Sequence, residues 1–266
     1  MNAPPKLIAD GIGLRVGDAD GRWLVRNLTG EFAVGTVTAI VGPNGSGKST
    51  LLRCLCGLEP PREGRVVLGA DAIESWPGRQ RARTVAYLPQ STPLVHALRV
   101  RDVVALGRAP YRARFIDMGR RAGDHVTEAL TRVQAVGLAD RLISTLSGGE
   151  RQRVMIARML ATGATHLLMD EPTSALDVGH ALSLHGLVRT LASQGRSVVI
   201  AMHDLDAARR LADVAICLDR RSGDGGHHRG PADSVLGPEV LAAVFGVSVR
   251  EVDGALRFEL GEPAPR

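Results

Sequence analysis

The sequence predicts an α/β fold in which helices cover both faces of a mostly parallel, doubly wound sheet. Residues 166–169 and 197–202 form short, almost continuous apolar runs, as expected for central strands buried on both faces. A third run, residues 36–41, is rich in β-branched residues and ends at a cluster of glycines. Helical segments separate these runs along the chain, and such alternation is typical of a doubly wound α/β core.

The first part of the chain is expected to supply β-structure and then a helix. Residues 5–35 and 65–68 are predicted to form an antiparallel β-layer. Residues 36–41 form a buried strand that enters a tight glycine-rich loop. Residues 50–58 follow as a helix that closes at Gly57.

The middle of the chain is expected to be helical. Residues 92–146 lack strong strand signals, and apolar residues recur there at helical spacing at Val126, Ala129, Leu130 and Val133. The helices that alternate with the later strands are expected over residues 150–161 and 180–193.

Length and composition indicate one globular domain. The chain has 266 residues, of which 44% are hydrophobic, 23% charged and 3% aromatic, and this excludes collagen, a disordered tail and a disulfide miniprotein. No apolar run approaches the ~18 residues of a membrane-spanning helix, and residues 1–10 show no secretory signal. We expect a single domain over residues 1–266, with an α/β core and β-layer over approximately residues 1–90 and 151–266, and a helical subdomain over residues 91–150.

Charge and cysteine content leave the chemistry open. The formal net charge is +5, and ten arginines accompany only Asp102 and Asp117 between Arg79 and Arg121. This basic segment is interpreted either as a solvated surface or as a surface that faces a partner or a membrane. We expect the three cysteines to be packing residues in a reduced compartment, because they show no paired metal-ligand spacing: Cys54, Cys56 and Cys217.

A glycine-rich loop between the predicted strand and helix matches the pattern G-x-x-x-x-G-K-[ST]. Its glycines let backbone N–H groups surround a phosphate, and the following helix adds its positive end. We expect Lys48 to reach the β- and γ-phosphates of a nucleotide and the Ser49 hydroxyl to ligate Mg²⁺. The candidate nucleotide-binding residues are Gly42, Pro43, Asn44, Gly45, Ser46, Gly47, Lys48, Ser49 and Thr50.

Two carboxylates follow the apolar run at residues 166–169. Asp170 is expected to hold Mg²⁺ through its shell, as in the Walker B pattern. Because adjacent residues point in different directions, Glu171 can face an attacking water as the general base.

A serine and two glycines stand at the start of the helix that leads to residue 161. Backbone N–H groups at such a helix start can bind a second phosphate surface. The candidate residues are Ser147, Gly148 and Gly149.

The order of these motifs resembles the ATP-binding cassette (ABC) ATPases over essentially the whole chain. Residues 42–50 resemble Walker A, residues 87–90 the Q-loop, residues 146–150 the family signature and residues 170–171 Walker B. Residues 174–177 resemble the D-loop and residues 203–204 the H-loop. The resemblance implies a P-loop NTPase (RecA-like) core that binds ATP and Mg²⁺.

The resemblance also implies roles for residues and a second copy of the chain. Two copies pack head to tail in this family, with each ATP between Walker A of one copy and the signature of the other. Gln90 would sense Mg²⁺ and the water, His203 would contact the γ-phosphate, and Asp177 would couple the paired sites.

Local matches resemble the ATPases of importers for iron-siderophore complexes, haem and vitamin B12: residues 103–111, 230–232, 235–236 and 244–247. This implies a peripheral subunit on the cytoplasmic side of the membrane, two membrane permease subunits and, indirectly, a substrate-binding protein. Nucleic acid is not an expected partner, because the chain has no long coiled-coil insertion and no second cassette. The alternatives are another cargo, including export, or a soluble ABC ATPase that acts on nucleic acid.

Two details depart from the family pattern. The positions near Val16 where many members carry an adenine-stacking aromatic are not aromatic, and Trp23 is interpreted equally as a stacking or a packed residue. Residues 222–230, which include His227 and His228, are expected to form a flexible exposed loop.

Overall fold

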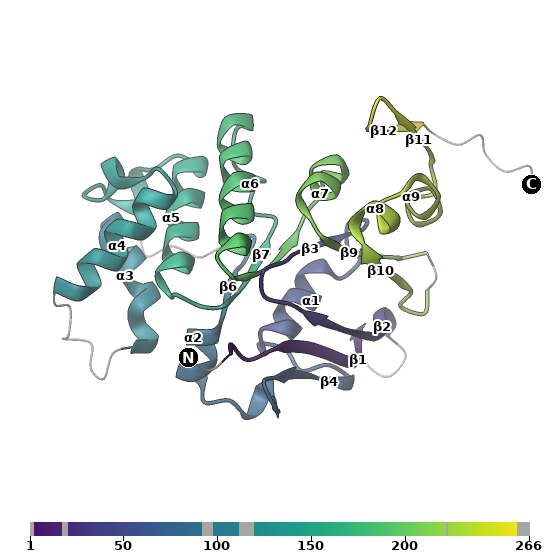
Figure 1. Ribbon diagram of the computed structural model, residues 1–266, viewed down its shortest axis with the longest axis horizontal. Helices are drawn as coiled ribbons and strands as arrows, with labels where there is room; N and C mark the ends of the chain where they lie inside the picture. Colours follow the sequence, from purple (N-terminus) through teal and green to yellow (C-terminus); the bar gives the residue numbers. More distant parts are fainter. Residues whose placement is uncertain (1–2, 18–20, 92–97, 112–119, 222, 260–266) are drawn as a thin grey trace, which may run out of the picture.

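The computed structural model describes residues 3–17, 21–91, 98–111, 120–221 and 223–259. Their elements form two sheets, a helical segment and a small C-terminal hairpin (Figure 1). The predicted α/β class is confirmed, because parallel strands alternate with helices through most of the chain.

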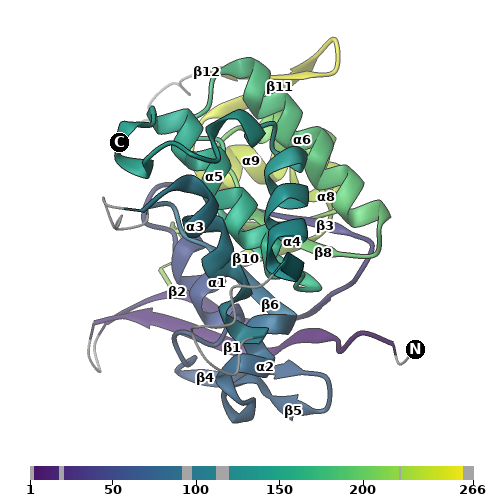
Figure 2. The ribbon, with the colours of Figure 1, turned by 90° about the vertical axis from the view of Figure 1, so that its left-hand side faces the viewer.

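An antiparallel sheet lies at one side of the molecule, in the strand order β2-β1-β4-β5 (Figure 2). Its strands are β1 (Leu7–Val16), β2 (Arg22–Phe32), β4 (Glu63–Leu68) and β5 (Asp71–Ala72). Alternating burial along β1 places one face of this sheet against the core. The predicted N-terminal β-layer is therefore confirmed.

The central sheet has six strands in the order β10-β9-β3-β8-β7-β6. All except β10 run parallel, and β10 pairs antiparallel with β9 at the edge. The strands are β3 (Val37–Val41), β6 (Val85–Leu88), β7 (His166–Asp170), β8 (Ser197–Ala201), β9 (Val214–Leu218) and β10 (His227–Pro231). Every residue of β3, β7 and β8 is buried, which explains their nearly continuous apolar sequences.

Helices cover both faces of the central sheet. Helix α1 (Lys48–Leu55) lies between this sheet and the antiparallel layer, where Leu51, Leu52 and Leu55 join a core with residues of both. The opposite face packs against α5 (Gly148–Ala161), α6 (Val178–Ser193) and α7 (Leu205–Leu211). Two hydrophobic cores therefore hold the sheet from its two sides.

The helical segment lies beside α5, as Figures 1 and 2 show. It contains α3 (Val100–Ala105), the 3₁₀ helix η2 (Leu106–Tyr111) and α4 (Arg120–Arg132). The predicted apolar residues of α4 are buried against α3 and α5. Shorter elements precede and follow this segment. They are η1 (Ile73–Ser75) and α2 (Gly78–Thr84) before β6, and η3 (Val136–Leu138) and η4 (Ile143–Thr145) between α4 and α5.

The chain ends in two helices and a hairpin, α8 (Ala232–Val235), α9 (Pro238–Phe245), β11 (Ser248–Val252) and β12 (Ala255–Glu259). The hairpin is tied to α7 by Leu256 N–H, which donates to Asp206 Oδ1 at 3.0 Å, and by Arg209 Nη1, which donates to Glu251 at 2.8 Å. Among the described residues, no helix is long and apolar enough to cross a membrane.

The prediction that residues 222–230 form a flexible exposed loop is wrong for residues 227–230. His227–Pro231 is strand β10, in register with β9 from Leu218 to Val214. Ser222 lies outside the described residues. The segment leading to β10 is also held, because Gly225 O accepts a hydrogen bond from Arg26 N–H at 2.9 Å. Backbone pairing supplies this order, which a Gly- and Arg-rich sequence does not signal.

The prediction that the three cysteines are packing residues is confirmed, because Cys54, Cys56 and Cys217 are buried in the cores. Burial raises the pKa of the Cys54 and Cys217 thiols to about 12 and that of Cys56 to about 11. Thiols with such pKa values are packing residues rather than nucleophiles.

Candidate functional site

The glycine-rich loop leaves β3 and leads directly into α1. Gly42, Gly45 and Gly47 all have positive φ angles, of 147°, 71° and 106°, so the loop conformation depends on glycine. A Cβ on Gly42 would lie 2.7 Å from Leu218 O, and one on Gly47 would lie 2.9 Å from Leu24 Cβ. The turn therefore fits only without these side chains, and it keeps backbone N–H groups beside the start of α1.

Lys48 is buried at the base of this loop, with only 5% of its surface exposed. Its Nζ donates to Gly42 O at 3.0 Å and to Pro43 O at 3.4 Å. Burial lowers the pKa of Lys48, and the charges of Glu171 and Asp170 oppose that shift. The ammonium group thus lies inside the loop, where it is held by carbonyl oxygens that a phosphate could replace.

Glu171 is the point on which the other predicted catalytic residues converge. Its Oε2 accepts a hydrogen bond from Gln90 Nε2 at 2.7 Å, and its Oε1 forms an ion-pair contact with His203 Nε2. Its Oε1 also lies 3.9 Å from Lys48 Nζ. Glu171 has a φ of 48°, in the left-handed region, so its backbone conformation is a strained one of the kind found at functional sites.

Asp170 lies beside Glu171 but faces elsewhere, as predicted from the alternation of side chains. Its Oδ2 accepts a hydrogen bond from the Tyr87 hydroxyl at 3.3 Å. Its Oδ1 is buried and has no hydrogen-bond partner among the described residues. A buried carboxylate oxygen with an unused lone pair has the chemistry of a ligand for an oxygen-bound Mg²⁺.

These residues surround one open cleft of about 470 Å³. Its lining includes the loop, the start of α1 and the converging side chains, namely Val16, Leu24, Asn44, Gly45, Gly47, Lys48, Ser49, Thr50, Gln90, Glu171 and His203. We call this the nucleotide cleft. It brings together nine predicted site residues from four separate segments, whereas Gly42, Pro43, Ser46 and Asp170 do not line it.

The predicted second phosphate surface is not part of the nucleotide cleft. Ser147, Gly148 and Gly149, here called the signature turn, begin α5 and do not line the cleft within one chain. Ser147 Oγ accepts a hydrogen bond from Glu150 N–H at 3.3 Å, and Glu150 Oε2 accepts one from Ser147 N–H at 2.8 Å. This capping box sets the direction of α5 and presents the turn on the surface.

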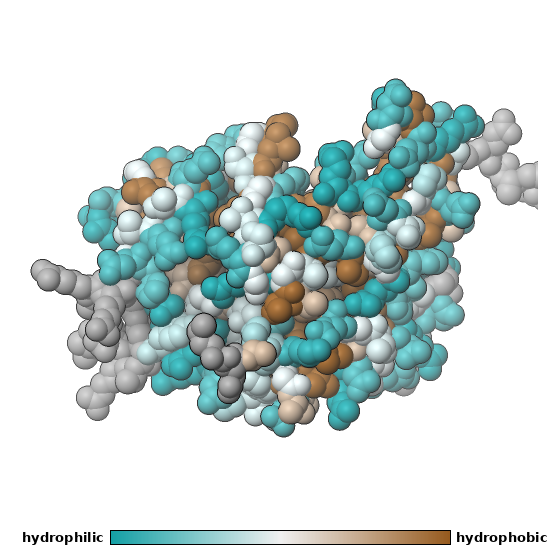
Figure 3. Space-filling view, viewed as in Figure 1, coloured by the Kyte–Doolittle hydropathy of each residue, from teal (hydrophilic) through white to brown (hydrophobic). Residues whose placement is uncertain are grey.

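Asp177 also lies outside the nucleotide cleft within one chain. Its side chain caps α6 by accepting a hydrogen bond from His180 N–H at 2.9 Å. That hydrogen bond lowers the pKa of the exposed Asp177 carboxyl. The next turn of α6 exposes two apolar side chains, Val178 at 77% and Leu182 at 64%, and Figure 3 shows a brown cluster at the end of this helix.

Trp23 is a packed residue in this structure. The Arg15 and Arg26 guanidinium groups lie 5.3 and 4.8 Å from its ring centroid, and it does not line the nucleotide cleft. Val16, which is 57% exposed, and Leu24 occupy the rim instead. The geometry therefore favours the packed interpretation over adenine stacking.

Sequence reasoning missed three side chains that support the cleft. Tyr87 holds Asp170, as described above, and burial raises the pKa of its hydroxyl, which keeps it a donor. Arg22 Nη2 donates to Gly45 O at 3.1 Å, and Arg220 Nη1 donates to Asn44 O at 3.1 Å. No local motif marks these arginines, because they approach the loop from distant parts of the chain.

Comparison with known proteins agrees with this geometry. Residues 25–174 match the family model described as ABC transporter. The chain is 41% identical over 249 residues to the hemin import ATP-binding protein HmuV of Gloeobacter violaceus, covering 91% of this chain and 87% of that protein.

Two solved structures share the fold. One, of a metal-chelate type ABC transporter in an inward-facing conformation, is 26% identical with a TM-score of 0.79 and covers 96% of both chains. The other is a dimeric, post-hydrolysis state of the cassette MJ0796 with ADP and Pi, at 26% identity and a TM-score of 0.75, over 85% of this chain and 98% of that one. The chain therefore belongs to the ABC transporter family, and its architecture is that of the family's ATP-hydrolysing cassette.

Proposed function

We propose that this chain powers the import of an iron-siderophore, haem or cobalamin-type substrate by hydrolysing ATP for separate permease subunits. The observation that carries the enzymatic part is the convergence of Lys48, Gln90 and His203 on Glu171 at the mouth of the glycine-rich loop. The cargo class follows from similarity to a hemin import protein and to a metal-chelate type transporter.

In this proposal Glu171 is the general base for the attacking water. Its carboxylate is 8% exposed, so few waters compete for it, and Gln90 Nε2 holds one of its oxygens at 2.7 Å. His203, whose side chain is 49% exposed, contacts the other oxygen and reaches outward to the γ-phosphate. Lys48 leaves its carbonyl partners for the β- and γ-phosphates when ATP enters.

Mg²⁺ would be held by Asp170, the Ser49 hydroxyl and Gln90. When bound, the ion neutralises charge that develops on the transferred phosphoryl group. Tyr87 fixes Asp170 through one oxygen and leaves the other, buried Oδ1, available as a ligand. Gln90 connects this ligand set to the proposed base, because the same side chain donates to Glu171.

A second copy would complete each cleft. The signature turn of one chain supplies backbone N–H groups at a helix start, a feature suited to the phosphates bound by the other chain. The dimeric cassette MJ0796 supports this assembly. Ala175 lies against the signature turn, since a Cβ on Gly149 would be 3.1 Å from Ala175 O, and the exposed Val178 and Leu182 of α6 would extend the contact between copies.

The permease would dock in a groove between the central sheet and the helical segment. This groove has a volume of about 310 Å³ and is lined by the backbone before Gln90, by η2 and by α5. Its apolar lining includes Leu88, Leu106 and Met159, which suits a short amphipathic helix of a membrane partner. Binding there would place the chain peripherally on the cytoplasmic side of the membrane.

The test is reconstitution with the partner rather than with the isolated chain. A tagged copy should recover a membrane permease from gently solubilised native membranes, and proteoliposomes of the complex should take up haem, ferric siderophore or cobalamin with ATP inside. Recovery of soluble proteins or nucleic acid alone, with DNA-stimulated hydrolysis, would overturn the import proposal and leave the ATPase chemistry intact.

A further inference from the structure

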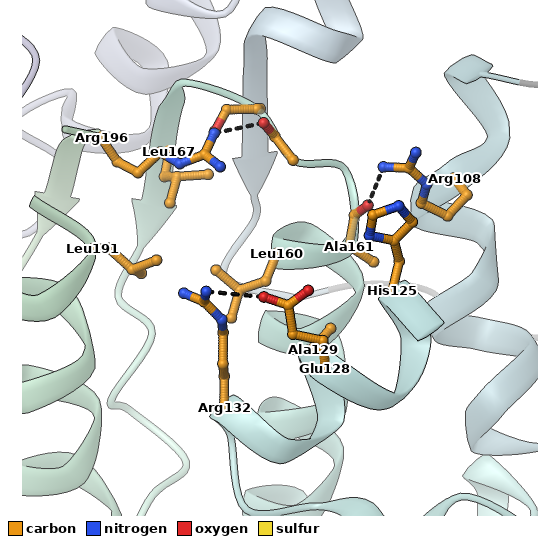
Figure 4. Close-up of a pocket in the computed structure, with 12 residues that line it drawn as sticks. Arg108, His125, Glu128, Ala129, Arg132, Leu160, Ala161, Leu167, Leu191 and Arg196 are labelled. Carbon is orange, nitrogen blue, oxygen red and sulfur yellow. Dashed lines mark hydrogen bonds and ion pairs between the residues drawn. The ribbon is translucent and has the colours of Figure 1, made fainter. Parts of the chain in front are cut away.

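A second polar cavity lies away from the nucleotide cleft, where the helical segment meets the central sheet (Figure 4). Its volume is about 180 Å³. Arg108 of η2, Arg132 of α4 and Arg196 at the start of β8 line it, above an apolar floor that includes Leu160, Leu167 and Leu191. We call it the arginine cavity. None of its lining residues belongs to the nucleotide cleft.

Two of the arginines are held by the carbonyl oxygens at the end of α5. Arg108 Nη1 donates to Ala161 O at 3.0 Å, and its guanidinium stacks 3.8 Å from the Tyr111 ring centroid. Arg196 Nη1 donates to Gly163 O at 2.5 Å and to Ala164 O at 2.6 Å. One nitrogen of each guanidinium therefore caps the C-terminal end of α5, and these hydrogen bonds hold both guanidinium groups in place.

The opposite wall of the cavity is also basic, and its arginine does not cap α5. Arg132 comes from α4, together with His125 and Glu128. Arg132 Nη2 donates to Glu128 Oε1 at 2.9 Å and its Nη1 donates to Gln194 Oε1 at 3.0 Å. Among the described residues that line the cavity, Glu128 supplies one carboxylate against three guanidinium groups, so the lining carries a formal charge of 3 − 1 = +2 apart from His125.

We infer that the arginine cavity binds a small phosphate-bearing anion. Arginine presents fixed, forked N–H donors that match phosphate oxygens, and the surrounding structure already holds each of these three. The leucine floor lowers the local dielectric and strengthens the attraction between an oxyanion and the cavity. An anion there would lie between η2, α4 and the residue that precedes β8, so it would connect the helical segment to the central sheet.

The cavity shares a wall with the groove proposed for the permease. Within η2, Leu106, Gly107 and Ala109 line the groove, whereas Arg108 between them lines the arginine cavity. An anion bound to Arg108 would therefore also restrict the motion of the η2 residues that line the groove. Anion binding itself needs no permease, so it can be tested apart from the import proposal.

The probe is inorganic pyrophosphate, titrated without Mg²⁺ into the full chain carrying Lys48→Ala, which weakens phosphate binding in the nucleotide cleft. Calorimetry should still detect one binding event. Adding Arg132→Gln should weaken it by about tenfold, the loss of one charge-assisted contact, whereas adding Glu128→Gln should tighten it several-fold. Amide hydrogen exchange of residues 106–111 and 120–132 should slow when pyrophosphate binds.

The matched control is Arg257→Gln on β12, an exposed arginine far from the cavity in sequence, which should leave the affinity unchanged. Thermal melting verifies that each variant is folded. If Arg132→Gln does not fold, the pyrophosphate affinity of Glu128→Gln still tests the inference. Loss of all pyrophosphate binding in Lys48→Ala, or equal effects of Arg132→Gln and Arg257→Gln, would overturn the inference. ATP hydrolysis by the otherwise unchanged chain would survive that outcome.

Discussion

In the nucleotide cleft, side chains from three other segments converge on the Glu171 carboxylate, whereas at the signature turn the polar groups of Ser147 and Glu150 bond to each other. In the first region Lys48 and Glu171 are buried, and the neighbouring Asp170 has a carboxylate oxygen with no hydrogen-bond partner among the described residues. The second is exposed and locally satisfied by its capping box. One chain thus brings together the groups of the proposed hydrolytic site but leaves the signature turn outside it.

The difference separates two kinds of sequence dependence. Changes in the nucleotide cleft should alter binding or chemistry within one chain. Changes in the signature turn should leave ATP binding by one chain unchanged and alter what two chains do together. The following predictions test that separation, beginning with the largest effect.

Replacing the proposed base by its amide, Glu171→Gln, should lower ATP turnover by about a hundredfold or more, because general-base catalysis contributes about 10²–10⁴-fold. Gln keeps the shape of the side chain, so ATP affinity should change little. Steady-state hydrolysis and nucleotide titration check the two effects separately, and light scattering should show an ATP-dependent dimer. Turnover near that of the unchanged chain would remove Glu171 from the role of base.

Lys48→Ala should fail in the other way, by weakening ATP binding. The ammonium group is held at the phosphate position by Gly42 O and Pro43 O, and alanine offers no donor there. A loss of about tenfold or more in affinity is expected for a charge-assisted contact. Undiminished affinity in a nucleotide titration would contradict the phosphate role.

Ser147→Ala should leave ATP binding by a single chain unchanged and lower turnover by impairing the dimer. The same change removes the Ser147 side-chain acceptor of the capping box, which costs about 1 kcal/mol of unfolding free energy. Urea unfolding measures the second effect and ATP-dependent dimerisation in the Glu171→Gln background measures the first. Ser147→Thr keeps a capping hydroxyl and should restore stability. A dimer defect that persists in that variant would therefore result from altered contacts at the signature turn rather than from lost stability.

The smallest effect is expected at His166, at the end of β7 opposite to Asp170. Its Nε2–H donates to Pro5 O at 2.8 Å, and burial lowers the pKa of His166. Below about pH 6.5, the unperturbed value, the unfolded chain takes up a proton that the folded chain does not, so stability falls as pH decreases.

His166→Gln should flatten that dependence by at most about 1.4 kcal/mol per pH unit between pH 6.5 and the lowered value. Urea unfolding at a series of pH values measures the slope. ATP affinity at pH 7.5 should not change, since His166 does not line the nucleotide cleft. A change in ATP affinity in His166→Gln would contradict this prediction and show that the two ends of β7 are coupled.

The elements with strong local patterns were predicted from the sequence. Strands β3, β7 and β8 are fully buried, so their apolar runs signalled them, and helices α5 and α6 differ from the predicted ranges by two residues at their starts. Strands β6 and β9 are also short apolar runs, VAYL and VAICL, and were missed, whereas β10 has no apolar run and its order comes from pairing with β9. Within the site, the loop and the carboxylates have sequence motifs, whereas Tyr87, Arg22 and Arg220 act through contacts between distant segments.

The two arginines on the glycine-rich loop connect it to different bodies of the fold. Arg22 begins β2 of the antiparallel layer, and Arg220 follows β9 of the central sheet, yet they hold the neighbouring carbonyls of Gly45 and Asn44. A tilt of one sheet against the other would pull these adjacent peptide groups in different directions. These two hydrogen bonds therefore couple the conformation of the glycine-rich loop to the positions of both sheets.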